Sequence, residues 1–191
     1  MMNNKTAPST VHSFLAERWS PRSFTDVPVT EEQVSALLEA LRWSPSCFND
    51  QPWRLILGLN SRDDGHHAAI IDLLADGNRI WAPRAPLLLI ACAHTRFDHN
   101  GEHNRWAQYD TGAAMLSLTL QALTMGLYVH QMGGFDAEAT RRVFSLPSHV
   151  VPMAAAAVGH RGEDVSHLPD WAAESELGPR ARKPVEDLLI P

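Results

Sequence analysis

Two groups of arginines lie near the two ends of the chain, Arg18 with Arg22 and Arg180 with Arg182. Ser20 adds a hydroxyl to the first group, where a proline turns a short helix into an extended segment. Residues two apart in an extended chain point the same way, so the second pair of guanidinium groups can converge. Two such groups suit a terminal phosphate, which carries about −1.5 to −2 charges and accepts bidentate contacts. Each group taken alone is more simply interpreted as solvated surface charge.

The chain contains ten histidines, and His94, His99 and His103 lie close together. His99 and His103 are four residues apart, so on a helix they would share a face and could bind a metal ion. The alternative is a solvated loop, which Gly101 favours because it breaks the helical geometry that the site would need. We therefore predict no metal site.

Cys47 could act as a nucleophile if a base or a positive charge lay beside it. The sequence does not supply that neighbour, and a small residue chosen for packing is the simpler interpretation. The sequence has no G-x-G-x-x-G fingerprint, no phosphate-binding P-loop and no G-x-S-x-G, H-E-x-x-H or C-x-x-C motif. If the chain is an enzyme, a bound group is expected to carry the difficult chemistry.

Alternating helical and extended patterns predict the elements that position these residues. Ser9 or Thr10 is expected to cap a first short helix, and Thr30 with Gln33 fits a capping box that begins a helix ending near Trp43. Apolar runs predict strands at 53–59, 86–93, 128–130 and 150–158, and periodicity predicts helices at 66–74, 106–125 and 136–144. The tail is polar until a short apolar end at 185–190. The class is α+β or α/β, with about four strands and about five helices.

Length and composition indicate one ordinary globular domain over residues 1–191, with residues 1–8 expected to be disordered. Hydrophobic residues are 45% of the chain and charged residues 20%. The formal net charge of −6 disfavours nucleic acid or an anionic membrane as a partner. The apolar stretch 113–129 carries polar side chains, so it predicts a buried helix and no membrane span. Two cysteines and a polar N-terminus indicate a reducing compartment, the cytoplasm.

Six motifs, the last made of two segments, resemble elements of the nitroreductase family of flavoproteins in chain order. They are Arg18-x-Ser20-x-Arg22-x-Phe24, then Pro45-Ser46-x-x-Asn49-x-Gln51-Pro52-Trp53, Asn78 with Ala85-Pro86, the long helix from Trp106 to Gly126, Met132-Gly133-Gly134-Phe135-Asp136, and the closing segments Ala154 to Gly159 and Pro179 to Pro184. Each motif is modest by itself, but six in the right order over Arg18 to Leu188 make a specific signal.

The resemblance implies an α+β fold in which helices flank a mainly antiparallel central sheet. It also implies an intertwined homodimer, in which the C-terminal segment of one subunit commonly adds to the sheet of the other. The apolar end at 185–190 would suit that exchange. Two FMN molecules would lie at the dimer interface.

The resemblance also assigns site residues. The FMN phosphate and ribityl tail would be held by Arg18, Ser20, Arg22, Arg180 and Arg182, in agreement with the charge argument, with Trp19 contributing through its backbone. The isoalloxazine ring would be approached from the partner subunit by Ser46, Cys47 and Asn49, with Trp43 beside them. Gly133 and Gly134 would lie along the ring, where a backbone N–H could reach flavin N5, and Asn78 and Met132 belong to the same cofactor site. The segment 94–105 is where the family often has a substrate lid, so substrate contacts are expected from His99, His103 and Trp106.

Two residues depart from the family's pattern. Many members carry an acidic or other side chain where this chain has Gly133, so the flavin face would be more open here. Cys47 stands where serine or another small or polar residue is common.

The implied activity is FMN-dependent transfer of hydride from NAD(P)H, through flavin N5, to an electron-poor acceptor such as a nitroaromatic compound or a quinone. One site shared by donor and acceptor predicts ping-pong kinetics, and no side chain need act as an acid–base catalyst. Relatives of this fold also reduce enals and carbonyl precursors, remove halogens from aromatic rings or cleave flavin. A non-catalytic flavin sensor, or a globular protein whose arginines are merely surface charge, are the remaining alternatives.

Overall fold

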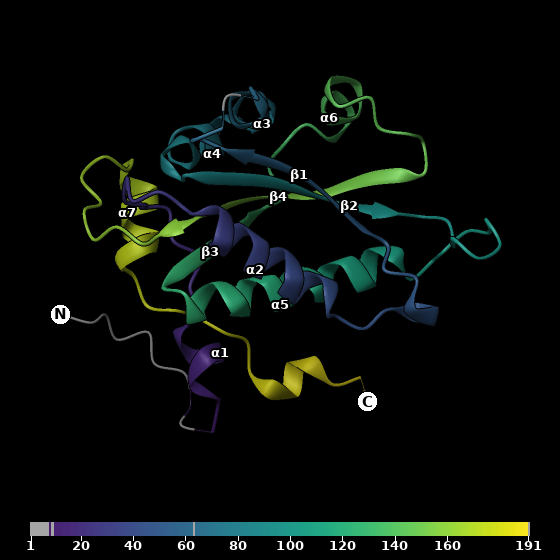
Figure 1. Ribbon diagram of the computed structural model, residues 1–191. Helices are drawn as coiled ribbons and strands as arrows, with labels where there is room; N and C mark the ends of the chain where they lie inside the picture. The colour runs from purple at the N-terminus through teal and green to yellow at the C-terminus, as the bar shows by residue number, and fades with distance from the viewer. Residues whose placement is uncertain (1–7, 9, 63, 191) are drawn as a thin grey trace.

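The computed structural model describes residues 8, 10–62 and 64–190. The predicted disorder of 1–8 therefore concerns residues that, except for Pro8, lie outside the described ones. One antiparallel sheet forms the middle layer (Figure 1), with the strand order β1-β2-β4-β3. The strands are β1 (Trp53–Leu59), β2 (Leu87–His94), β3 (Leu127–Met132) and β4 (Val150–His160). The α+β class with an antiparallel sheet is thus confirmed.

Alternation along the central strands separates two hydrophobic cores. Leu87, Leu89 and Ala91 of β2 face one core, whereas Leu88 and Ile90 face the other. Successive side chains of a strand point to opposite faces, so a strand covered on both sides is apolar throughout. That is why this strand reads as one continuous apolar run in the sequence.

Helices cover both faces of the sheet (Figure 1). On one face lie α2 (Glu31–Arg42) and α5 (Ala107–Thr124), and on the other α3 (His66–Leu73), α4 (Asp76–Arg79) and α6 (Ala137–Val143). The predicted capping box is present, because Thr30 Oγ accepts from the Gln33 N–H at 3.2 Å and Gln33 Oε1 accepts from the Thr30 N–H at 3.0 Å. Each contact satisfies a donor that the first turn of α2 leaves unpaired.

The first helix begins later than predicted. α1 (Ser13–Glu17) is capped by His12, whose Nδ1 accepts from the Phe14 N–H at 3.3 Å. The prediction that Thr10 caps it is wrong, and Ser9 lies outside the described residues. Imidazole nitrogen can take the place of the usual hydroxyl or carboxylate acceptor, which the propensity rule does not anticipate.

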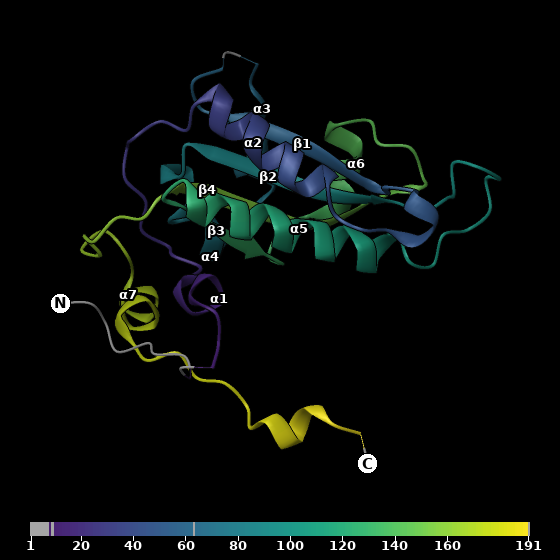
Figure 2. The same ribbon diagram turned by 60° about the horizontal axis from the view of Figure 1, so that its bottom comes forward.

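A helix that the sequence did not reveal, α7 (Asp170–Leu177), lies at one end of the sheet (Figure 1), and its Glu176 accepts from the indole N–H of Trp19, which follows α1. Its buried residues are Ala172 and Glu176, so its inner face has no apolar stripe to give a periodic signal. At the opposite end lie the short helix η1 (Cys47–Asn49) and the segment 94–105 (Figures 1 and 2).

Beyond α7 the chain leaves the body of the molecule and ends in η3 (Val185–Leu188), as both views show (Figure 2). The four large apolar side chains of this end are exposed, with Ile190 at 95%. No helix in the described ranges is both long and apolar enough to cross a membrane.

Candidate functional site

The two arginine groups meet in one cavity of about 320 Å³ between the chain around α1 and the chain after α7. Its lining residues are Arg18, Trp19, Ser20, Arg22, His130, Ser175, Pro179, Arg180, Ala181 and Arg182. No carboxylate is among the described residues that line it, so the wall is strongly cationic. Such a concentration of guanidinium groups suits a multiply charged anion.

Arg180 joins the C-terminal segment to the end of α1. Its guanidinium donates to the carbonyl of Arg18 at 2.9 Å and to that of Ala16. The last carbonyls of a helix lack partners within the helix, and a cation there also interacts favourably with the negative end of the helix dipole. Arg180 therefore caps α1 and brings the two arginine groups together.

The guanidinium of Arg18 is partly buried close to other positively charged groups of the cavity. Its Nη1 donates to Ser20 Oγ at 3.1 Å. Burial lowers the pKa of the Arg18 guanidinium, and the positive charges of Arg180 and Arg182 lower it further. An arginine remains charged regardless, so the lowered pKa indicates a positive potential that a bound anion would relieve.

Arg22 is held by residues of α7. Its Nη1 donates to Ser175 Oγ at 3.0 Å, and its guanidinium lies 5.4 Å from the ring centre of Trp171. Its backbone N–H donates to Glu176 Oε2 at 3.0 Å. Both the main chain and the side chain of Arg22 are therefore positioned by the helix that the sequence did not reveal.

His130 of β3 forms part of the cavity wall in its neutral form. Its Nδ1 lies 3.0 Å from the Pro21 carbonyl, which can only accept, so Nδ1 carries the proton. Burial lowers the pKa of His130 to about 4, and the nearby positive charges of Arg22 and Arg18 act in the same direction. The ring also packs against Trp81, with 4.5 Å between ring centres.

The predicted glycine turn follows β3. Asn78 Nδ2 donates to the Gly134 carbonyl at 3.0 Å, and a Cβ added to Gly134 would lie 2.8 Å from that nitrogen. Gly133 is exposed, and a Cβ added there would meet nothing within 4 Å. Met132 is buried. Asn78 thus fixes the turn while open space adjoins Gly133.

Ser46, Cys47 and Asn49 lie together in and before η1. Ser46 Oγ accepts from the Gln51 N–H at 2.9 Å, and the Cys47 N–H donates to Asp110 Oδ2 at 2.9 Å. Asp110 is only 6% exposed and lies in the first turn of α5. η1 is therefore tied to the N-terminal end of α5.

The backbone around η1 adopts a costly conformation. Phe48, Asn49 and Gln51 have φ values of 54°, 55° and 50°. Residues other than glycine pay on the order of 1–3 kcal/mol for such conformations, which cluster at functional sites. Phe48 is 80% exposed and Trp43, which precedes η1, is 76% exposed, its indole N–H donating to Glu39.

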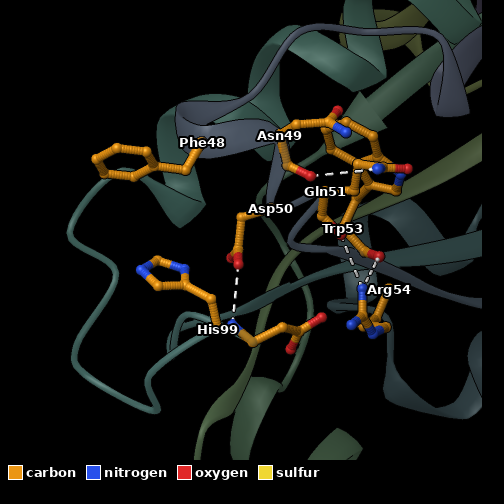
Figure 3. Close-up of a pocket in the computed structure, with 8 residues that line it drawn as sticks. Phe48, Asn49, Asp50, Gln51, Trp53, Arg54 and His99 are labelled. Carbon is orange, nitrogen blue, oxygen red and sulfur yellow. Dashed lines mark hydrogen bonds between the residues drawn. The ribbon is translucent and has the colours of Figure 1, made fainter.

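A second cavity, of about 470 Å³, lies between η1 and the segment 94–105 (Figure 3). Asn49, Gln51, Arg54 and His99 contribute to its wall, and the His99 ring lies 5.6 Å from that of Phe48. The side chains drawn in Figure 3 come from η1, from the start of β1 and from the facing loop.

Of the three predicted substrate residues, only His99 lines this cavity. His103 pairs instead with Arg96 in an isolated β-bridge. Trp106 occupies the N-cap position of α5, and the Arg105 guanidinium lies 4.7 Å from its ring centre. Gly101 adopts a φ of 73°, so 99–103 is a turn and the two histidines share no helix face.

The two groups of predicted cofactor residues lie far apart within the chain. The segments that form the arginine cavity, around α1 and after α7, lie toward the C-terminal end of α5, and η1 lies at the N-terminal end of the same helix (Figures 1 and 2). The 18 residues of α5 span about 27 Å.

The sequence assigned no role to several residues of the site, although Asp110 lies in the long-helix segment that resembles the family. His130 and Ser175 line the arginine cavity, and Glu176 supports it from behind. Asp110 and Asp50 anchor η1 and the loop that faces it. Residue type and spacing alone gave none of them a role, because each acts through a contact that only the fold creates.

The sequence profile of the Nitroreductase family matches residues 15–64 and 60–160. A Mycolicibacterium smegmatis protein, described as an uncharacterized 15.4 kDa protein, is 35% identical over 146 residues, covering 72% of this chain and 94% of its own. A Streptomyces coelicolor protein, described as a candidate NADH dehydrogenase/NAD(P)H nitroreductase, is 28% identical over 177 residues, covering 82% and 88%.

A solved structure described as an oxidoreductase containing FMN superimposes with a TM-score of 0.90 at 32% identity, covering 98% of this chain and 94% of that one. The extent of the profile match and the shared fold identify the chain as a member of the nitroreductase family.

Proposed function

We propose that this chain is an FMN-dependent oxidoreductase that uses NAD(P)H to reduce electron-poor organic acceptors such as nitroaromatic compounds and quinones. The observation that carries the proposal is the cationic cavity, where two arginine groups some 160 residues apart in the chain converge and the described lining residues include no carboxylate. Membership of the family, the FMN named for the similar solved structure and the NAD(P)H named for the Streptomyces relative support it.

The residues present fit FMN in two respects. Arg18, Arg22, Arg180 and Arg182 bring positive charge and N–H donors to one cavity, and burial with the charges of Arg180 and Arg182 lowers the pKa of Arg18, a crowding of charge that a bound phosphate would relieve. Gly133, three residues beyond His130 of the cavity wall, leaves open space in which a planar ring could approach the backbone.

We propose that a second copy of the chain completes the site. Ser46, Cys47 and Asn49 lie at the opposite end of α5 from the arginine cavity, so one subunit would hold the phosphate and its partner would present η1 to the ring. The exposed apolar tail from Val185 to Ile190 supports such a dimer, because an apolar segment held away from its own body gains free energy when a partner covers it.

When bound, FMN would supply the hydride chemistry, accepting from NAD(P)H and passing to the acceptor in ping-pong order. This chain's residues would hold and orient the cofactor. Arg18, Arg22, Arg180 and Arg182 would neutralise the phosphate, neutral His130 would close the wall without adding charge, and the strained η1 would present fixed backbone groups to the ring.

The test is the absorbance spectrum of the purified protein, followed by anaerobic addition of NADPH or NADH. We expect flavin bands that bleach with a reduced nicotinamide and return when a quinone or nitroaromatic compound is added. Flavin that neither nucleotide reduces would contradict the proposed donor. A colourless protein that FMN cannot reconstitute would contradict the cofactor assignment.

A further inference from the structure

We infer that Glu176 is the positioning residue of the arginine cavity, the group that sets the cavity's preference for a phosphate-bearing ligand. The inference rests on the proposed function, since it concerns how the same cavity would hold the FMN phosphate. It assigns a role to a residue that does not line the cavity and that carries no motif.

The side chain of Glu176 is fully buried, with at least three donors around its carboxylate. Oε1 accepts from the Trp19 indole N–H at 2.8 Å, Oε2 accepts from the Arg22 backbone N–H at 3.0 Å, and Arg161 Nε lies 3.5 Å from Oε1. A buried carboxylate is costly unless hydrogen bonds and an opposite charge compensate it, and here they do. An apolar side chain, such as that of Ala172 on the same face of α7, could be buried here without the free-energy cost of removing a charge from water. Packing alone therefore does not explain the carboxylate.

Two of these three donors belong to residues that line the cavity, Trp19 and Arg22. Ser175 and Trp171, on the same helix, reach the guanidinium of Arg22 while Glu176 holds its backbone. Glu176 therefore fixes the direction in which the first arginine group enters the cavity.

The second arginine group, Arg180 and Arg182, follows Glu176 closely in the chain. α7 ends at Leu177, one residue after Glu176, and the chain then runs directly to Arg180, which caps α1. The guanidinium groups around the cavity crowd positive charge: burial lowers the pKa of Arg18, and the charges of Arg180 and Arg182 lower it further. A negative charge directly behind the wall offsets that repulsion without occupying the space that a phosphate would need.

The experiment compares two ligands that differ only in the phosphate. The dissociation constants of FMN and of riboflavin are measured by flavin fluorescence on the full-length protein after removal of flavin, for the wild type and for Glu176→Gln. The glutamine can still accept from Trp19, but its amide group would face the Arg22 N–H with a donor.

We expect Glu176→Gln to weaken FMN binding about tenfold or more, the usual effect of losing a charge-assisted hydrogen bond, and to leave riboflavin binding unchanged. Glu174→Gln is the matched control, because it removes the same charge from an exposed position of the same helix and should change neither constant. A merely structural role would weaken both flavins equally, and that result, or an unchanged preference for FMN, would overturn the inference.

Glu176→Asp keeps the buried charge and tests the same point if the glutamine variant does not fold. The shorter side chain cannot reach Trp19 and Arg22 together, so we expect a selective loss of FMN affinity, and equal affinities to wild type would reject the positioning role. A wild-type protein that binds neither flavin would overturn the proposed function itself, which separates the two failures.

Discussion

Arg182 differs from the other arginines of the cavity in how little of the fold depends on it. Its side chain is exposed, and among the described residues its guanidinium donates to the adjacent Ala181 carbonyl at 2.6 Å. Arg180, by contrast, caps α1. Removal of Arg182 therefore separates ligand binding from folding more cleanly than removal of its neighbours.

Arg182→Ala is expected to weaken FMN binding about tenfold without a measurable change in melting temperature, because it removes a charged donor from the phosphate and no buried contact. Flavin retention on gel filtration and a thermal melt of the apoprotein measure the two effects. Lys183→Ala, which removes a neighbouring positive charge outside the cavity lining, should leave FMN binding unchanged. Equal losses in the two variants would mean that overall charge, and no specific contact, holds the ligand.

His130 makes stability depend on pH. Its pKa in the folded protein is about 4, below the ordinary 6.5, so between these values the unfolded chain binds a proton that the folded chain does not. The contribution of neutral His130 to the free energy of unfolding is complete above pH about 6.5, decreases as pH falls and is lost below pH about 4. Its full size is on the order of 3 kcal/mol.

His130→Asn retains a donor for the Pro21 carbonyl and has no such titration. The variant should therefore show a shallower fall in the free energy of unfolding between pH 7 and pH 4.5, measured by urea denaturation. Parallel curves for wild type and variant would show that His130 is not held neutral.

At the scale of elements, one carboxylate joins η1 to the loop at 94–105. Asp50 Oδ1 accepts from the Asp98 N–H at 2.9 Å (Figure 3), and its Oδ2 accepts from Asn104 Nδ2 at 2.9 Å. Asn104 is buried, so this clasp fixes both ends of the loop tip against η1. The loop that faces the second cavity is thus held by the same segment that contributes Asn49 to it.

Asp50→Ala should raise amide hydrogen exchange in 95–104 while leaving β2 protected, because the loop loses two anchors and the sheet loses none. Mass spectrometry of peptic fragments measures this directly. Glu102→Gln alters an exposed charge in the same loop and should exchange like the wild type. If the exchange of 95–104 does not change in Asp50→Ala, the aromatic contacts of Phe48 with Phe97 and His99 suffice to hold the loop.

At the scale of the whole molecule, the two groups of residues proposed to hold the cofactor lie at opposite ends of the chain's body. The arginine cavity and η1 lie at opposite ends of α5, and the tail beyond α7 extends from the body with its apolar residues exposed. α1 adds Phe14 and Leu15, which are also exposed. A second copy that covers these surfaces would complete both sites at once.

Truncation after Pro184 removes the apolar end and leaves all four arginines of the cavity in place. We expect the full-length protein to be a dimer and the truncated one to shift toward monomer, with loss of FMN, in gel filtration coupled to light scattering. Leu188→Asp together with Leu189→Asp should have the same effect, because charge in place of apolar surface opposes burial. A truncated protein that remains a dimer would reject tail exchange.

Local signals in the chain were sufficient for most of the elements. The capping box at Thr30 depends on contacts between near neighbours, and the strands at 53–59 and in β2 depend on a pattern of apolar residues that burial imposes. Both kinds of signal are therefore visible in the sequence. Residue type and local spacing also predicted that the two arginine groups suit a phosphate.

Only the tertiary structure decided which residues surround that chemistry. α7 has a buried face built around Glu176, whose partners Trp19 and Arg22 lie more than 150 residues away, so no local pattern could mark it. His130 reads as one histidine among ten until the fold places it against Pro21. The physical reason is common to both: an isolated buried polar group is unfavourable, and its place becomes intelligible only when distant donors and acceptors compensate it.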